Sequence, residues 1–119
     1  MTEFTEDVIE IIKSIPKGKV MTYGQIAACA GNPWGARQIS RILSSMSKKY
    51  DLPWHRVINS KGEISLKGEE YLIQMSMLSD DSVEVVNGKI DLKKYLYQYT
   101  QQNKKREIWK YSNTKKVLK

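Results

Sequence analysis

The fold is decided by residues 22–47, which read TYGQIAACAGNPWGARQISRILSSMS. Thr22 is a favourable helix N-cap, and the residues after it predict a helix from Tyr23 to Ala30. The run Gly31-Asn32-Pro33 ends that helix, and another is expected from about Trp34 or Gly35 to Ser47. The apolar face of this longer helix consists of Ile39, Ile42, Leu43 and Met46. Two helices joined by a tight turn predict a helix-turn-helix, although plain helical hairpins have the same shape.

Shorter elements are predicted on both sides of this pair. An apolar stripe predicts a helix from Phe4 to Ile15, with Thr5 near its N-terminus as a cap. The segments Leu52–Ile58 and Glu63–Ser65, with a turn between them, resemble a two-stranded ribbon or wing. A further helix is expected from about Glu69 to Leu78.

The C-terminal part carries a turn signal and a last helical pattern. Asn87-Gly88 lies between short apolar runs and is a strong signal for a β-hairpin. Asp91 is placed to cap a helix from Leu92 to about Gln102. The elements together predict an α+β, mainly helical fold. We expect one domain over residues 1–103 and a basic C-terminal tail over residues 104–119.

The charge balance favours a polyanionic partner. The chain has 20 Lys and Arg residues against 13 Asp and Glu, a formal net charge of +7. Such an excess attracts nucleic acid first among polyanions. Part of it lies in the tail, since residues 104–119 hold seven basic residues and one acid. These basic residues could contact phosphates, form a solvated tail or act as a nuclear-type signal, and the sequence leaves these alternatives open.

Length and residue counts exclude several classes of protein. The 119 residues suit a single domain, and no apolar run approaches the roughly 20 residues that cross a bilayer. The acidic start, Met1 to Asp7, lacks the layout of a signal peptide. The single Cys29 cannot form an internal disulfide, nor build a zinc site with the single His55. We therefore expect an intracellular protein without metal, cofactor or membrane association.

Five segments of the chain resemble one known family, in order and with matching spacings, from about Phe4 to Val85. The segments are IPKGKV (15–20), TYGQIA (22–27), GNP (31–33), ARQ (36–38) and PWHRVI (53–58). They look like the C-terminal domain of O6-alkylguanine-DNA alkyltransferases. The resemblance implies a winged helix-turn-helix domain that enters the minor groove of DNA.

Trp54 departs from the transferases at the position that matters most. The transferases have a cysteine in a Pro-Cys-His-Arg motif, and that cysteine takes up the alkyl group. An indole has no thiolate and cannot replace it as a nucleophile. Cys29 lies far away in sequence and is interpreted as a small core residue. The chain is thus similar to the alkyltransferase-like proteins, the non-catalytic branch, and we expect no catalytic residue.

That resemblance implies a function and assigns roles to residues. The branch binds O6-alkylguanine in double-stranded DNA without repairing it and passes the lesion to nucleotide excision repair proteins. Arg37 matches the arginine that fills the gap left by a flipped nucleotide, and Tyr23 matches the tyrosine that crowds the 3′ phosphate. Their alternative roles are a surface or phosphate-contacting arginine and a core or capping tyrosine. The expected DNA contacts are Thr22, Tyr23, Trp34, Ala36, Arg37 and Gln38.

The lesion pocket is expected around the PWHRVI motif. Its predicted residues are Tyr23, Trp54, His55, Val57, Ser60 and Lys67. Trp54 is expected to form a wall of the pocket, His55 to have a structural or hydrogen-bonding role, and Lys67 to donate to the lesion, to donate to a phosphate or to stay solvated. Arg56 is interpreted as a buried, paired scaffold residue. Gly35 and Ala36, being small, are expected to allow close approach to DNA.

Two other functions fit parts of the sequence. A general winged helix-turn-helix DNA-binding protein or transcription factor explains the charge and the helices, but not the segment from Pro53 to Ile58. A degraded alkyltransferase with slow chemistry at another residue is the third reading. For the lesion-binding function we expect a monomer. We expect it in the nucleus of a eukaryote, or in the cytoplasm and nucleoid of a prokaryote.

Overall fold

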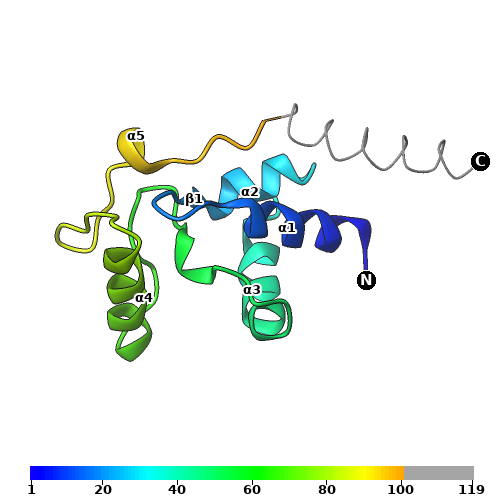
Figure 1. Cartoon of the computed structure of the whole chain (residues 1–119). Coiled ribbons are helices and arrows are strands. Elements are labelled where there is room, and N and C mark those ends of the chain that lie inside the picture. The colour runs from blue at the N-terminus through cyan, green and yellow to red at the C-terminus, as the bar shows by residue number, and fades with distance from the viewer. Residues whose placement is uncertain (101–119) are drawn as a thin grey trace, which may run out of the picture.

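The computed structural model describes residues 1–100 of the chain. Its helices and strands follow one another in the order drawn in Figure 1. They are α1 (Glu3–Ser14), β1 (Met21–Thr22), α2 (Tyr23–Cys29), α3 (Ala36–Tyr50), η1 (Trp54–Arg56), β2 (Val57–Ile58), α4 (Glu69–Asp80) and α5 (Leu92–Tyr95).

The first three helices form the larger half of the molecule and confirm the helix-turn-helix prediction. Thr22 caps α2 through a capping box, because its side chain accepts from the Gln25 backbone N–H at 3.0 Å and the Gln25 side chain accepts from the Thr22 N–H at 3.2 Å. Helix α1 packs against both α2 and α3. Its cap is Thr2 rather than the expected Thr5, since the Thr2 hydroxyl accepts from the Thr5 N–H at 3.1 Å.

The predicted ribbon over Leu52–Ile58 and Glu63–Ser65 is wrong. Its first half is a 3-10 turn, η1, followed by β2, which pairs in parallel with β1 in the register Met21↔Val57 and Thr22↔Ile58. Parallel pairs are usually buried on both faces, and all four of these residues are buried. A sequence pattern cannot show a partner more than thirty residues away, so local alternation indicated the wrong neighbour.

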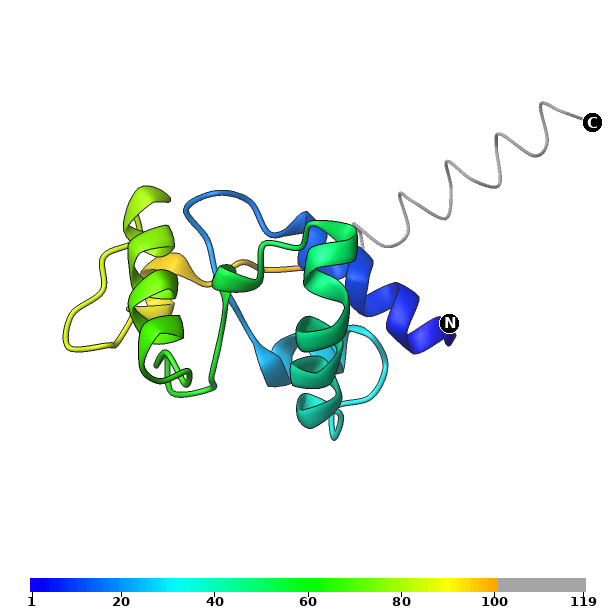
Figure 2. The same cartoon turned by 90° about the horizontal axis from the view of Figure 1, so that it is seen from below.

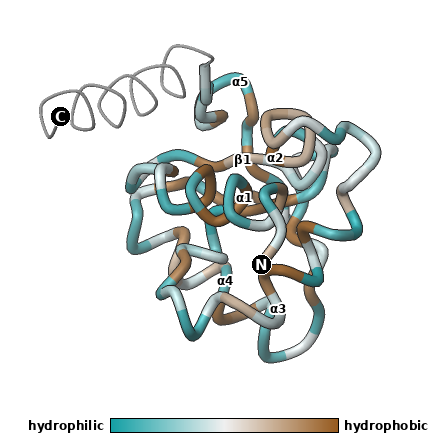
Figure 3. Tube along the Cα trace, turned by 90° about the vertical axis from the view of Figure 1, so that its right-hand side faces the viewer, coloured by the Kyte–Doolittle hydropathy of each residue, from teal (hydrophilic) through white to brown (hydrophobic). Residues whose placement is uncertain are grey.

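The short β1–β2 pair joins two hydrophobic clusters. Met21 and Val57 face the cluster built on α1, α2 and α3, whereas Val20 and Ile58 face a second cluster with Leu78 of α4. This is the alternation of a strand whose successive side chains point to opposite sides. Figures 1 and 2 show α4 on one side of the molecule, α3 on the other, and the green segment with η1 and β2 between them. In Figure 3 hydrophobic stretches gather around α1 and β1.

The C-terminal elements confirm one prediction and correct another. Val86 and Lys89 exchange backbone hydrogen bonds of 2.9 and 3.0 Å across Asn87-Gly88, which is the expected hairpin turn. The last helix is α5 alone, because Tyr97 leaves helical geometry and donates its N–H to the Val20 carbonyl at 2.7 Å. The rest of the expected helix, residues 101 and 102, and the predicted tail lie outside the described residues.

Within residues 1–100, no helix has both the length and the apolar character needed to cross a membrane. The same residues contain no cluster of three or more side chains suited to hold a metal ion.

Candidate nucleic-acid interface

The PWHRVI motif is held between the two halves of the molecule. Helix α4 packs against η1, and the buried Gln74 side chain donates to the carbonyls of His55 and Val57, both at 3.0 Å. These two hydrogen bonds give buried backbone carbonyls of the motif a side-chain partner. Gln74 thus fixes the path of the backbone on either side of Arg56, and Trp54 is presented at one end of the turn.

A buried carboxylate ties the motif to the end of α4. Asp81 accepts from His55 Nε2 at 2.9 Å and from Arg56 Nε at 2.7 Å, with a second Arg56 nitrogen at 3.3 Å. Arg56 also donates to the Ile15 carbonyl at 2.9 Å. Arg56 is therefore paired, as expected of a scaffold residue, but it is half-buried rather than buried.

The two acid–base groups of this network have shifted pKa values. Burial lowers the pKa of His55 below its ordinary value, and the hydrogen bond and charge of Asp81 offset only part of that effect. Burial alone would raise the pKa of Asp81, but hydrogen bonds from Arg56 and His55 outweigh it and hold the pKa below its usual range. At neutral pH the network therefore contains an ionised Asp81 and a neutral His55 whose Nε2–H donates to it.

A cavity of about 290 Å³ opens beside Trp54, between α3 and α4. It is lined by Tyr23, Ser40, Leu43, Ser44, Ser47, Trp54, Leu66, Glu70, Ile73 and Gln74. Tyr23 at the start of α2 and Trp54 in η1 are thereby brought to one site, as the sequence predicted for the lesion pocket. Ser47 contributes a buried hydroxyl that has no hydrogen-bond partner among the described residues. A cavity with aromatic and aliphatic walls and a few polar groups suits a planar base.

One family model and several named relatives match most of the chain. Residues 3–83 match the family described as 6-O-methylguanine DNA methyltransferase, DNA binding domain. A DNA base-flipping protein of Vibrio parahaemolyticus is 46% identical over 99 residues, which cover 82% of this chain and 99% of the relative. Alkyltransferase-like protein 1 of Schizosaccharomyces pombe is 37% identical over 106 residues, which cover 82% of this chain and 96% of the relative. The chain belongs to the alkyltransferase-like proteins of this family.

The fold agrees with a solved alkyltransferase-like protein. The crystal structure of S. pombe Atl1 in complex with damaged DNA containing O6-carboxymethylguanine has a TM-score of 0.75 to this chain at 35% sequence identity. The match covers 83% of this chain and 98% of that chain. The expected fold class, the helix-turn-helix domain of this family, is confirmed.

Four residues predicted for the lesion pocket of this alkyltransferase-like protein do not line the α3–α4 cavity. His55 is buried against Asp81, and Val57 is buried in the cluster of α1, α2 and α3. Ser60 and Lys67 are exposed. The serines of α3 and Glu70, Ile73 and Gln74 of α4 line the cavity and were not predicted from the sequence. A polar Gln74 four residues before Leu78, on the buried face of a helix, was the signal that could have revealed one of them.

The residues expected to contact DNA differ in how exposed they are. Arg37 and Gln38 are exposed in the first turn of α3, and Trp34 in the preceding turn is 92% exposed. Tyr23 and Ala36 are half-buried. Thr22 is 9% exposed, and its hydroxyl already caps α2. The exposed group forms one end of the helix-turn-helix, where it can reach a duplex without moving the core.

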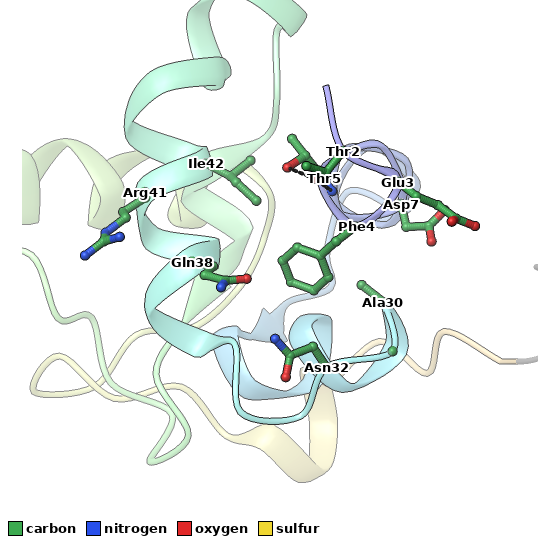
Figure 4. Close-up of a pocket in the computed structure, with 11 residues that line it drawn as sticks. Thr2, Glu3, Phe4, Thr5, Asp7, Ala30, Asn32, Gln38, Arg41 and Ile42 are labelled. Carbon is green, nitrogen blue, oxygen red and sulfur yellow. Dashed lines mark hydrogen bonds between the residues drawn. The ribbon is translucent and has the colours of Figure 1, made fainter.

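Gly35 packs tightly inside the protein, and the close approach to DNA expected of it stays a prediction. It is buried, and an added Cβ would lie 3.1 Å from the Asn32 carbonyl oxygen and 3.2 Å from Phe4 Cζ. Phe4 belongs to a second cleft, of about 770 Å³, between α1, the α2–α3 turn and α3. In Figure 4 its ring projects into this cleft between Asn32 and Ile42. The cleft is not lined by Tyr23 or Trp54.

Cys29 is remote from the cavity. It is half-buried at the end of α2, its Sγ lies 3.8 Å from the Tyr99 carbonyl oxygen, and it is not among the residues that line the α3–α4 cavity.

Proposed function

We propose that this protein binds O6-alkylguanine in double-stranded DNA, rotates the nucleotide out of the helix and holds the base in the α3–α4 cavity without taking up the alkyl group. The observation that carries the proposal is the juxtaposition of Tyr23 and Trp54 in one cavity of about 290 Å³ beside α3. Its relatives support it, since one is named a DNA base-flipping protein and another was crystallised with damaged DNA.

The exposed end of the helix-turn-helix is the proposed docking surface. Taking a base out of the stack costs a few kcal/mol, so the gap has to be filled. Arg37 is exposed at the start of α3, and a long guanidinium can both enter the stack and bind polar groups there. Tyr23, between this surface and the cavity, would crowd the 3′ phosphate. Trp34 and Gln38 would contact the minor groove on either side.

The absence of alkyl transfer is part of the proposal and rests on the chemistry of the cavity. Among the residues that line it there is no thiol, and Trp54 has no acidic proton to lose. His55 Nε2 is occupied by Asp81, and Cys29 lies elsewhere. A protein that holds a lesion without changing it needs other proteins to remove it. We propose nucleotide excision repair proteins as those partners, with this protein acting as an intracellular monomer.

Two measurements on matched duplexes test the function. Gel-shift or anisotropy titrations compare duplexes that differ only in guanine or O6-methylguanine, and we expect tighter binding of the lesion. Equal affinities would remove the lesion-binding role. Incubation with DNA that carries a radiolabelled O6-methyl group should leave the label on the DNA. Stoichiometric transfer to the protein would contradict the non-enzymatic reading and support a degraded alkyltransferase instead.

A general winged helix-turn-helix DNA-binding protein or transcription factor remains the second candidate. It needs α3 and the basic charge, but no base pocket. If Trp54→Ala left binding to both duplexes unchanged, this second function would be favoured. A reporter base beside the lesion, such as 2-aminopurine, would then show no rise in fluorescence on binding, because no base would leave the stack.

A further inference from the structure

The two walls of the α3–α4 cavity differ in chemistry. The α3 wall supplies the hydroxyls of Ser40, Ser44 and Ser47 together with Leu43. The α4 side supplies Glu70, Ile73 and Gln74. Among the described residues that line the cavity, Glu70 is the only one with a charged side chain. The lining of the cavity thus carries one negative side chain, that of Glu70, and no positive side chain.

The carboxylate of Glu70 is available to interact with a ligand. It lies in the first turn of α4, its side chain is exposed, and no ion pair joins it to another described residue. Its neighbour Glu69 is also exposed but does not line the cavity. The N-terminus of α4 is the positive end of the helix dipole and would attract an anion. The carboxylates of Glu69 and Glu70 already occupy that first turn.

We propose that Glu70 is a specificity-determining residue that makes the pocket select neutral O6 substituents and disfavour anionic ones. The proposal rests on the lesion-binding function proposed above and adds the chemical class of the lesion. Methyl, ethyl and hydroxyalkyl arms are accepted, because Leu66, Ile73 and Trp54 offer apolar surface and Glu70 can accept a hydrogen bond from a hydroxyl. A carboxymethyl arm brings a second carboxylate into the same small space.

The volume of the cavity makes this repulsion hard to avoid. At about 290 Å³ it lies at the lower end of the range for ligand sites, so an arm on the base cannot withdraw far from the rim. Two carboxylates that share one cavity repel each other, and the lining offers no lysine or arginine to neutralise the second one. Because Glu70 is exposed, solvent and salt weaken the effect, so we expect a preference of about three- to tenfold at low salt.

The experiment compares affinity ratios rather than affinities. Dissociation constants are measured at low salt for duplexes of one sequence that carry O6-methylguanine, O6-carboxymethylguanine or guanine. The wild type should bind the methyl lesion about three to ten times more tightly than the carboxymethyl lesion. Glu70→Gln should bring this ratio close to one, and Glu70→Lys should reverse it.

Glu69→Gln is the matched control. It removes the same charge from the same turn of α4, but from a residue that does not line the cavity. Glu69→Gln should leave most of the methyl-to-carboxymethyl preference in place. If the preference fell equally in both variants, the total negative charge of the first turn of α4 would set it, and not Glu70 in particular. In the wild type the ratio should also shrink as salt is raised, because the repulsion is screened.

The possible outcomes distinguish a failure of the role of Glu70 from a failure of the lesion-binding function. If the wild type binds neither lesion more tightly than guanine, the lesion-binding function fails and the inference with it. If the methyl lesion is preferred over guanine but Glu70→Gln leaves the methyl-to-carboxymethyl ratio unchanged, the function stands and the role of Glu70 is overturned. Circular dichroism of each variant shows that the exposed substitution leaves the fold intact.

Discussion

Tyr23 and Trp54 line the same cavity, although 31 positions separate them in the chain. The two residues flank the parallel strand pair. Tyr23 directly follows β1, whereas Trp54 lies in η1, directly before β2, and the cavity between α3 and α4 receives both side chains.

The two tryptophans should have separable effects on DNA binding. Trp54→Ala should lower affinity for O6-methylguanine DNA by about 10- to 100-fold, because stacking of a base on an aromatic side chain is worth about 1–3 kcal/mol. Trp34→Ala should weaken binding to lesion and plain DNA alike, since Trp34 is 92% exposed and does not line the cavity. Anisotropy titrations with both duplexes measure this. A uniform loss for Trp54→Ala would contradict the pocket.

Asp81 should be a main determinant of stability. Asp81→Asn removes the charge that pairs with Arg56 and His55, and we expect a loss of about 2–3 kcal/mol in the free energy of unfolding. This is less than for a fully buried pair, because Arg56 is half-buried and keeps its bond to Ile15. Asp80→Asn, at the exposed neighbouring position, should change stability by no more than about 0.5 kcal/mol. Urea denaturation of both variants tests the difference.

Stability should fall in mild acid because of His55. Burial lowers its pKa in the folded state below the ordinary value, so the unfolded chain binds a proton first as the pH drops. The contribution of neutral His55 is complete above a pH of about 6.5 and is lost below it, toward the lowered folded pKa. Asp81, whose pKa is also lowered, adds a loss in the same direction below a pH of about 3.9.

The measurement is the urea midpoint at pH 7.5, 6.5 and 5.5, with His55→Gln compared against its own value at pH 7.5. Asp81 is the carboxylate that contacts the imidazole, and its lowered pKa places its own titration below this range. The variant should therefore show a flatter profile than the wild type. An equally steep decline in the variant would assign the acid sensitivity to other groups.

Replacing Ser47 with alanine should raise the stability of the protein and weaken its binding to the lesion. Its buried hydroxyl has no hydrogen-bond partner among the described residues, so Ser47→Ala should raise the free energy of unfolding by about 1 kcal/mol. The same change should weaken lesion binding about three- to tenfold if the hydroxyl bonds to the flipped base. Ser45→Ala is the control, because the Ser45 hydroxyl donates to the Arg41 carbonyl at 2.9 Å on the exposed side of α3. Ser45→Ala should leave lesion affinity unchanged, and a matching affinity loss in both variants would argue against a base contact.

Gly35 and Gly24 should respond oppositely to alanine. A Cβ at Gly35 would lie 3.1 Å from the Asn32 carbonyl oxygen and 3.2 Å from Phe4, so Gly35→Ala should destabilise the protein by about 1–2 kcal/mol. A Cβ at Gly24, within α2, would meet nothing within 4 Å, and Gly24→Ala should stabilise by about 0.5–1 kcal/mol. Thermal denaturation distinguishes them. Equal stability of Gly35→Ala and wild type would show that Phe4 and Asn32 can move aside.

The sequence predicted the local elements well, because their signals lie within a few residues of one another. The cap at Thr22 and the hairpin at Asn87-Gly88 depend only on neighbouring backbone groups. The ribbon and the long last helix were wrong for one reason. Val57 pairs with Met21, and Tyr97 with Val20, and in both cases a distant partner replaces the local hydrogen bonds.

By itself the sequence determined a helix-turn-helix, the place of Arg37 at the start of its second helix, and a motif whose Trp54 cannot form a thiolate. Only the tertiary structure decided what surrounds the indole. Ser47, Glu70 and Gln74 reach the cavity or the motif from helices on opposite sides, through the parallel strand pair and the packing of α4 on η1. Periodicity gives the face of a residue on its own helix, but not which other helix that face meets, and so the charge and polar contacts of the pocket depend on packing across the whole fold.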